Sequence, residues 1–419
     1  MTTARACSFE ANGRTYDLGP VPVAVICVDG CCQDYLDAAI AAGAMPHTER
    51  LLAQGFGGLC EGCLPSYTNV NNSAIVTGTP PSVHGISGNF FLDPETGEEV
   101  MMNSPEFLRV STIFPAAEAA GRRIAVLTSK DKLRTILSYE LERPIAFSAE
   151  CCRDATEEVN GITDVEALVG MEAPSVYSAE ASVFVIAAGA ALVEADKADL
   201  LYLSTTDYIQ HKHAPEEPEA IDFYRMMDRE IGRLLDAGCV VGLTADHGMN
   251  AKQKSDGTPD VLFLEEVLSE EYGDAVTVIL PITDPYVVHH GALGSFAVVH
   301  LSEGADADAV HATISALPGV TEVYHREEAA ERLELPADRI GDIVCVSGQS
   351  VVLGRRRELH DLSAVEQGLR SHGGRHETEI PFLVSSPLPE GWDGRALRNF
   401  DLFEATCAAS HLAATAASS

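Results

Sequence analysis

Four apolar runs rich in β-branched residues constrain the fold of this chain more than any other feature. Each leads directly into polar or small residues, and together they cover residues 21–28, 123–128, 200–203 and 240–244. Helical patterns separate them, at residues 34–54 and 220–235 among others. Strands that are apolar on both faces and alternate with helices form a parallel sheet covered on each side. We therefore expect an α/β fold in which ligands bind beyond the carboxyl ends of the strands.

A smaller unit follows a polar, turn-rich break at residues 254–259. Residues 295–300 and 321–325 have strand patterns, and a helical pattern at residues 306–317 lies between them, which gives a βαβ-like order. We predict a core made of residues 1–254 and 360–419. A smaller α+β domain, residues 255–359, is expected to be inserted into it and to cap the pocket.

The chain is strongly acidic, with 63 acidic against 28 basic residues and a formal net charge of -35. Such a surface repels nucleic acid and anionic membranes, so we expect neither as a partner. The longest apolar run, residues 181–193, is too short to span a bilayer and indicates a buried helix. An anionic substrate would need a locally positive pocket in so acidic a protein.

The amino terminus and the cysteines favour a cytoplasmic protein. Residues 1–13 lack the apolar stretch of a secretory signal. The eleven cysteines are an odd number and do not suggest a disulfide framework. Cys60 and Cys63 form a lone Cys-x-x-Cys pair, which we interpret as packed thiols because no second pair accompanies it. The oligomeric state stays open, with a homodimer as one alternative.

Side chains of the metal-ligand type follow three of the four apolar runs. Asp29 follows the first, Asp207 and His211 follow the third, and Asp246 and His247 follow the fourth. A single aspartate after a strand is more often a helix cap than a ligand. Such residues at the same end of three strands together favour a metal site. Carboxylate oxygens mixed with imidazole nitrogens suit zinc better than manganese or iron.

A further candidate ligand, His372, lies near the end of the chain in a Ser-His-Gly-Gly segment. His376 is the alternative to His372 as the last ligand. We expect His213, His289 and His290 to be ordinary polar residues, because a lone histidine is more often satisfied by hydrogen bonds than by a metal.

Five segments together resemble the alkaline phosphatase superfamily, in its nucleotide pyrophosphatase/phosphodiesterase-like branch. They are VDG at 28–30, PSYTNVNNSAIVTG at 65–78, HGISGNFF at 84–91, TTDYIQH at 205–211 and TADHGM at 244–249. The resemblance implies a mostly parallel sheet flanked by helices, and two Zn²⁺ ions. It implies that one ion is held by Asp207, His211 and His372. It implies that the other is held by Asp29, Asp246 and His247, together with the hydroxyl of Thr68.

Thr68 precedes a helical pattern at residues 69–77. On its own, a threonine at this position is most simply a helix N-cap. The resemblance to the superfamily implies that this threonine is the nucleophile, because the positive end of the helix and a coordinated zinc would lower the pKa of its hydroxyl. The preceding segment from Cys63 to Ser66 resembles the sulfatase signature. Tyr67 stands where that signature has arginine, so we reject a sulfatase.

Lys130 and Lys132 follow the second apolar run. The simplest alternative for them is a solvated loop. Two Zn²⁺ ions and three ligand aspartates together have a net charge of about +1, and the two lysines raise the net charge of the pocket to about +3. That charge matches a fully ionised phosphonoacetate. A phosphodiester carries a single negative charge and does not need both lysines, so a small anionic phosphonate is the expected substrate.

Three segments resemble the phosphonoacetate hydrolases of this branch: SKDK at 129–132, residues 84–103, and SHGG at 371–374. The resemblance implies that Lys130, Lys132 and His211 bind the substrate carboxylate, and that Thr68 and Asn89 bind the phosphonyl group. The implied reaction cleaves the C–P bond to acetate and phosphate through a phosphothreonine, as in phosphonate catabolism. The alternatives are a phosphodiesterase or nucleotide pyrophosphatase of the same superfamily, and a non-catalytic phosphonate-binding metalloprotein.

Overall fold

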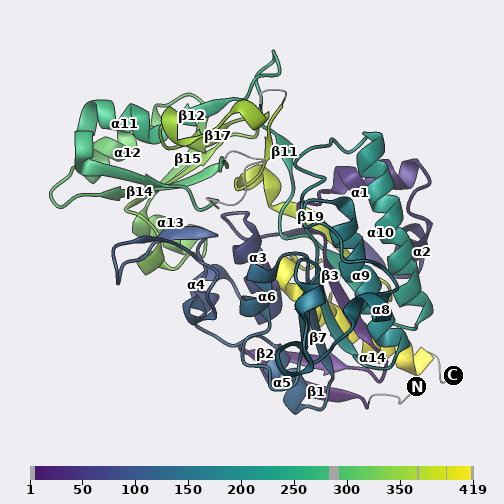
Figure 1. The fold of residues 1–419 in the computed structure, drawn as a ribbon. Coiled ribbons are helices and arrows are strands. Elements are labelled where there is room, and N and C mark those ends of the chain that lie inside the picture. Colours follow the sequence, from purple (N-terminus) through teal and green to yellow (C-terminus); the bar gives the residue numbers. More distant parts are fainter. Residues whose placement is uncertain (1–4, 283–291, 366–367, 393, 417–419) are drawn as a thin grey trace.

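The centre of the molecule is a seven-stranded sheet (Figure 1). The computed structural model describes residues 5–282, 292–365, 368–392 and 394–416. The strand order is β4-β19-β10-β3-β9-β7-β8. In that order the strands span Phe56–Glu61, Glu379–Val384, Val240–Thr244, Val23–Cys27, Leu200–Ser204, Ile124–Thr128 and Ile145–Ser148. The five strands from β10 to β8 are parallel, and β19 is antiparallel to both of its neighbours.

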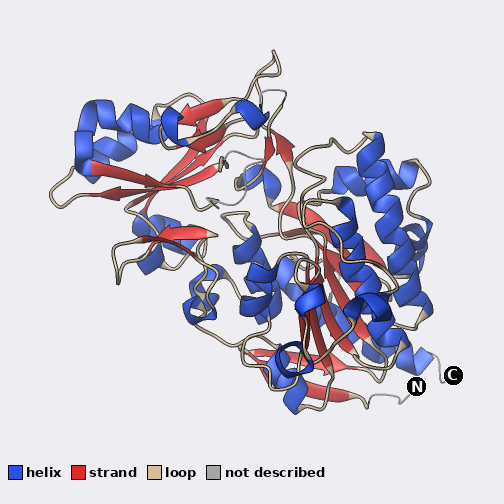
Figure 2. Ribbon diagram, in the orientation of Figure 1, coloured by secondary structure: helices blue, strands red, loops and turns tan. Residues whose placement is uncertain are grey.

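The four apolar runs of the sequence are β3, β7, β9 and β10, and every residue of these strands is buried. They are buried on both faces because helices cover both sides of the sheet (Figure 2). One layer contains α1 (Gln33–Ala41), α2 (Pro46–Gln54), α9 (Ala179–Glu194) and α10 (Pro218–Asp236). The other contains α3 (Thr68–Thr77), α6 (Asp131–Leu137) and α14 (Leu402–Ala416). The predicted α/β class with a mostly parallel, helix-flanked sheet is confirmed.

The prediction of a single helix over residues 34–54 is wrong. The structure divides it into α1 and α2. Gly43 between them has a φ of 66°, a left-handed conformation that glycine adopts without strain. Pro46 then begins α2, where its missing N–H costs no helical hydrogen bond.

The apolar stretch at residues 181–193 lies inside α9, and all of these residues are buried. The expected buried helix is therefore confirmed. Among the described residues, none of the helices combines the length and the apolar character needed to cross a bilayer.

A second, four-stranded sheet stands apart from the first in Figure 1. Its order is β13-β14-β16-β15, spanning Val276–Ile279, Phe296–Leu301, Ile343–Ser347 and Val320–His325. The expected βαβ-like piece is formed by β14, α12 (Ala307–Ser315) and β15. Its strands are parallel but not adjacent, because β16 pairs antiparallel with both and lies between them. Two helices, α11 (Leu264–Tyr272) and α13 (Arg326–Arg332), belong to the same region.

The chain passes from the main sheet to the smaller sheet and back through two segments that lie side by side. β11 (Asn250–Ala251) leaves the main sheet and pairs with β18 (Arg370–Ser371), where the chain returns. Beyond β11, the short strand β12 (Val261–Phe263) pairs with β17 (Val352–Gly354). The limits of the predicted insertion, residues 255–359, stay a prediction. The remaining elements are β1 (Cys7–Ala11), β2 (Arg14–Leu18), α4 (Pro81–His84), β5 (Phe90–Leu92), β6 (Glu99–Met101), α5 (Phe114–Ala119), α7 (Glu157–Asn160) and α8 (Val165–Val169), besides short 3-10 turns.

Helix α3 packs against two apolar clusters. Ile75 and Val76 belong to the cluster around the main sheet. Val70 and Ala74 belong to a second cluster that includes β14 and β16 of the smaller sheet. Helix α3 therefore packs against the cores of both sheets.

Candidate active site

A cleft at the carboxyl edge of the main sheet collects most of the side chains predicted from the sequence. They are Asp29, Thr68, Asn89, Lys130, Lys132, Asp207, His211 and His372. The other two predicted residues, Asp246 and His247, are completely buried and lie against Asp29. We call the six carboxylates and imidazoles the floor of the pocket: Asp29, Asp207, His211, Asp246, His247 and His372. We call Asn89, Lys130 and Lys132 its rim.

The register of the parallel strands brings the floor together. The last residues of β10, β3 and β9 (Thr244, Cys27 and Ser204) are directly paired neighbours. Asp246, Asp29 and Asp207 follow these ends by only two or three residues. The three carboxylates therefore emerge at one level of the sheet, where water is excluded.

The three floor histidines are oriented in the same way. The Nδ1 atom of His211 lies 2.8 Å from the carbonyl oxygen of Arg370, and that of His372 lies 2.8 Å from the carbonyl oxygen of Ser66. The Nδ1 atom of His247 lies 2.9 Å from the carbonyl oxygen of Gly248. A carbonyl oxygen accepts a hydrogen bond, so each Nδ1 carries the hydrogen and each Nε2 is the ring nitrogen that faces the floor. A backbone carbonyl behind the ring is the usual partner of a metal-binding histidine.

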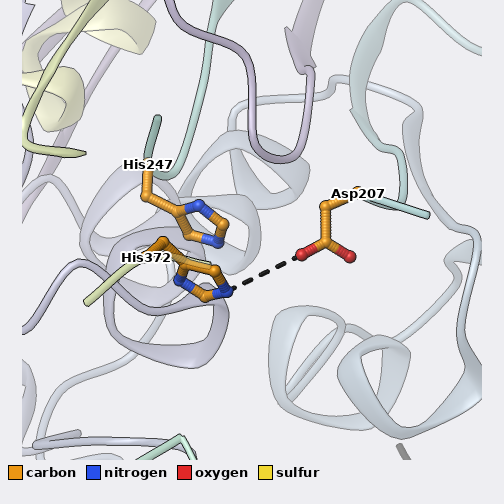
Figure 3. A group of neighbouring side chains, drawn as sticks. All are labelled: Asp207, His247 and His372. Carbon is orange, nitrogen blue, oxygen red and sulfur yellow. Dashed lines mark ion pairs between the residues drawn. The ribbon is translucent and has the colours of Figure 1, made fainter. Parts of the chain in front are cut away.

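The Nε2 atoms face the floor carboxylates. His211 Nε2 lies 2.8 Å from Asp207 Oδ2. His372 Nε2 lies 3.7 Å from the same oxygen, and Figure 3 draws this pair as a dashed line. On the other side of the floor, His247 Nε2 lies 3.3 Å from Asp29 Oδ1. The rings of His247 and His372 stack with their centres 3.6 Å apart. Each Nε2 atom thus lies within 3.7 Å of a carboxylate oxygen, so a cation placed between the two would have a nitrogen ligand and an oxygen ligand in reach.

Burial makes the floor costly without cations. Asp29 Oδ1 and His247 Nε2 are buried and have no hydrogen-bond partner among the described residues. Burial and the neighbouring Asp207 and Asp246 raise the pKa of Asp29 well above its ordinary value. Burial and Asp207 also raise the pKa of Asp246 to about 7. Burial alone would raise the pKa of Asp207 as well, but His211 beside it brings that pKa well below its ordinary value.

These residues fit divalent metal ions. Two groups of three have ligand atoms within 4.8 Å of one another: Asp207, His247 and His372, and Asp29, Asp246 and His247. The second group is the ligand set expected from the sequence. The first has His247 where the sequence-based assignment has His211, since His247 and His372 are stacked. His211 still lies next to Asp207, so the division of ligands between two ions stays a prediction.

Thr68 is the first residue of α3, and the N-cap position belongs to Tyr67. The threonine is therefore not the helix cap, and its half-buried side chain lines the cleft. The amide oxygen of Asn89 takes the capping role by accepting the backbone N–H of Asn69 at 2.9 Å. That contact uses the oxygen of Asn89, so its amide nitrogen is the group that it can offer to a ligand.

The rim lysines lie at the opening of the cleft. Lys130 follows the end of β7 by two residues, and its Nζ lies 3.8 Å from Asp207 Oδ1 with 34% of the side chain exposed. Lys132 lies in the first turn of α6, and its Nζ lies 4.0 Å from the sulfur of Met101. The two ammonium groups thus face one pocket, as expected for recognition of an anion.

The sequence did not suggest Asn72, which holds several parts of the floor together. Its Nδ2 donates to Asp246 Oδ2 at 3.1 Å and to the carbonyl of Thr68 at 3.0 Å. Its Oδ1 accepts the hydroxyls of Tyr202 and Ser204. The signal in the sequence was the pair of adjacent asparagines, Asn71 and Asn72, inside a helical pattern.

The other candidates lie apart from the site. His376 is exposed, whereas His372 is buried in the floor. His213 lies 2.8 Å from Glu217 at the surface, and His289 and His290 lie outside the described residues. Cys60 and Cys63 are free, packed thiols, and burial raises the pKa of each to about 12.

The sequence profile of the type I phosphodiesterase / nucleotide pyrophosphatase family matches residues 23–376. The chain belongs to this family. A Schizosaccharomyces pombe protein described as an uncharacterized pyrophosphatase/phosphodiesterase is 37% identical over 106 residues. That match covers 24% of this chain and only 21% of the relative.

Solved structures extend the similarity to nearly the whole chain. Phosphonoacetate hydrolase from Sinorhizobium meliloti, solved with phosphonoacetate and with phosphonoformate, is 50% identical. The similarity covers 97% of this chain and 99% of that one, with a TM-score of 0.93. Murine ectonucleotide pyrophosphatase / phosphodiesterase 5 shares the fold at 19% identity, with 94% and 95% coverage and a TM-score of 0.63. The resemblance to the phosphonoacetate hydrolases seen in the sequence is thus confirmed.

Proposed function

We propose that this chain is a metal-dependent hydrolase that cleaves the C–P bond of phosphonoacetate and releases acetate and phosphate. One observation carries the proposal. The two rim lysines line the same cleft as Thr68 and the carboxylate–imidazole floor. The structurally similar hydrolase from Sinorhizobium meliloti, with bound phosphonoacetate, supports the same substrate.

The floor would hold two metal ions, and zinc suits its mixture of carboxylates and imidazoles. Bound there, the ions would neutralise the three aspartates, lower the pKa of the Thr68 hydroxyl and stabilise charge on the phosphonate oxygens. The last ligand is assigned to His372.

Thr68 is the proposed nucleophile. Its hydroxyl loses its proton to solvent, the oxygen attacks phosphorus, a P–O bond forms, and the C–P bond breaks with its electron pair going to carbon. Position N1 of α3 supports this role because the positive end of the helix stabilises an anionic oxygen. Asn89 donates from its amide nitrogen to a phosphonyl oxygen and holds the group in line.

The rim lysines act on the leaving group. The electron pair left on carbon delocalises into the carboxylate of the departing acetate, where Lys130 and Lys132 stabilise the growing negative charge. A proton from water then completes acetate. Water next attacks the phosphorus of phosphothreonine, the P–O bond to Thr68 breaks, and phosphate and the free threonine are formed.

The deciding experiment measures phosphate release by the purified protein from phosphonoacetate, and hydrolysis of an aryl phosphodiester in parallel. We expect turnover of phosphonoacetate to be far faster, and a chelator to abolish it. A faster diester reaction would instead identify a phosphodiesterase or pyrophosphatase. A preparation that holds metal but releases no phosphate from either compound would identify a phosphonate-binding protein.

A further inference from the structure

A buried ion pair lies where the chain crosses between the two sheets. Lys252 Nζ and Glu377 Oε1 are 2.8 Å apart, and neither side chain is exposed. Lys252 directly follows β11, and Glu377 follows β18 by six residues. Burying two charges is expensive unless every donor and acceptor is satisfied. The proposed reaction uses neither residue.

The hydrogen bonds of the pair join three distant segments. Besides Glu377, Lys252 Nζ has a second partner in the carbonyl oxygen of Gln349 at 2.8 Å. Glu377 Oε1 also accepts Asn250 Nδ2 at 2.7 Å, and Glu377 Oε2 accepts the backbone N–H of Gly374 at 2.9 Å. These hydrogen bonds therefore connect the segment at β11, the segment after β16 and the segment after β18 at one point.

Two hydrogen bonds accepted by Glu377 come from segments next to the floor of the pocket. Gly374 lies two residues after His372. The backbone N–H of Gly248, next to His247, donates to the carbonyl oxygen of Glu377 at 2.8 Å. His247 and His372 are the two stacked rings of the floor. Glu377 therefore contacts the backbone beside both histidines.

The segment after His372 needs an external restraint. It consists of Gly373 and Gly374, and Gly373 has a φ of 113° that side-chain-bearing residues rarely adopt. A Cβ on Gly373 would lie 2.4 Å from the hydroxyl of Tyr67, so this position must be glycine. Glycines give a loop little stiffness of their own. Hydrogen bonds from Gly373 to Ser66 Oγ and from Gly374 to Glu377 supply it instead.

We propose that the Lys252–Glu377 pair is a positioning device, which fixes the backbone at His372 and His247 so that their Nε2 atoms are aimed before metal binds. The inference rests on the proposed metal-dependent function. Its direct consequence concerns metal affinity, because loss of an interaction that orients a ligand typically lowers affinity about 10- to 100-fold.

Two matched double variants test the idea. Lys252→Met/Glu377→Leu removes both charges and the acceptor for Gly374, with volumes roughly kept. Lys252→Met/Glu377→Gln also removes both charges but keeps an amide oxygen that can accept from Gly374. Zinc affinity is measured by chelator competition on the metal-stripped proteins. We expect the leucine variant to bind zinc about 10- to 100-fold more weakly, and the glutamine variant to retain most of the affinity.

Kinetics and a remote control separate positioning from general stability. In the leucine variant at subsaturating zinc, kcat should fall with little change in the KM for phosphonoacetate. Arg122→Met removes another buried ion pair, with Asp199 at the opposite end of the sheet. It should lower the Tm without changing zinc affinity. Wild-type zinc affinity in the leucine variant would overturn the proposal.

Hydrogen exchange on the wild-type protein covers the case in which the leucine variant does not fold. The amides of Gly373, Gly374 and Glu377, which donate hydrogen bonds in this segment, should be protected in the metal-stripped protein, because the pair pins them before metal arrives. Exchange as fast as in an exposed loop would reject the proposal. A wild-type protein that binds zinc but releases no phosphate from phosphonoacetate would refute the proposed function and leave these affinity and exchange comparisons intact.

Discussion

The floor and the rim of the pocket hold charge in different surroundings. In the floor, the side chains of Asp29, Asp246 and His247 are at most 2% exposed, and some of their polar atoms have no partner among the described residues. In the rim, 34% of the Lys130 side chain is exposed, and Lys132 is exposed. Buried charges interact strongly and are little affected by salt, whereas exposed charges are hydrated and screened. We therefore propose that the floor carries the chemistry and that the two rim lysines select the leaving group.

Thr68 lies between the two regions, and its removal should have the largest effect. Thr68→Ala should lower kcat/KM for phosphonoacetate on the order of 10⁴- to 10⁶-fold, as for other enzymes that lose their nucleophile. Metal content should not change. Thr68→Ser, which keeps a hydroxyl, is the matched control and should retain measurable turnover. Near-normal turnover by the alanine variant would mean that water attacks directly.

In the floor, Asp246→Asn should lower kcat/KM about 1,000-fold or more, because bound metal supplies several kcal/mol of transition-state stabilisation. Bound metal, measured by elemental analysis, should fall together with activity, and the loss should not depend on salt concentration. Asp199→Asn changes an equally buried carboxylate at the far end of the sheet and should keep its metal. Full metal content in Asp246→Asn would contradict the role of the floor.

In the rim, Lys130→Ala and Lys132→Ala should each lower kcat/KM for phosphonoacetate about 10- to 100-fold, the usual worth of a hydrogen bond to a charged group. Added salt should reduce the difference from wild type. Hydrolysis of an aryl phosphodiester should hardly change. Lys254→Ala, at an exposed position outside the cleft, is the control. Equal losses for both substrates would remove the distinction between floor and rim.

The smallest expected effect concerns stability against pH in the metal-stripped protein. The pKa of Asp246 is raised to about 7 in the folded state, and that of Asp29 is raised as well. The folded state therefore binds more protons than the unfolded state between about pH 4 and pH 7, so stability should fall as pH rises through this window. Metal-loaded protein should not show this fall, because metal binds the ionised carboxylates. Melting temperatures of both forms across this range provide the test, and parallel curves would contradict it.

Local patterns in the sequence predicted much of the molecule. Apolar runs located β3, β7, β9 and β10, because burial on both faces leaves a continuous hydrophobic signal. Polar residues after those strands located most of the floor. The break between α1 and α2 was missed although the sequence marks it with Gly43 and with Pro46 at the start of α2. The position of β16 between β14 and β15 was missed because strand order is not written in any single segment.

The sequence by itself determined which residues stand at the ends of the parallel strands, and thus the aspartates of the floor, since the ends of buried strands follow from local chemistry. Only the tertiary structure decided which nitrogen of His211 and of His372 faces the site, since their carbonyl partners on Arg370 and Ser66 lie more than a hundred residues away in the chain. It likewise decided that Asn72 supports Asp246 and that Glu377 pins the segment after His372. Such hydrogen bonds join separate segments, and no local pattern encodes which segments will meet.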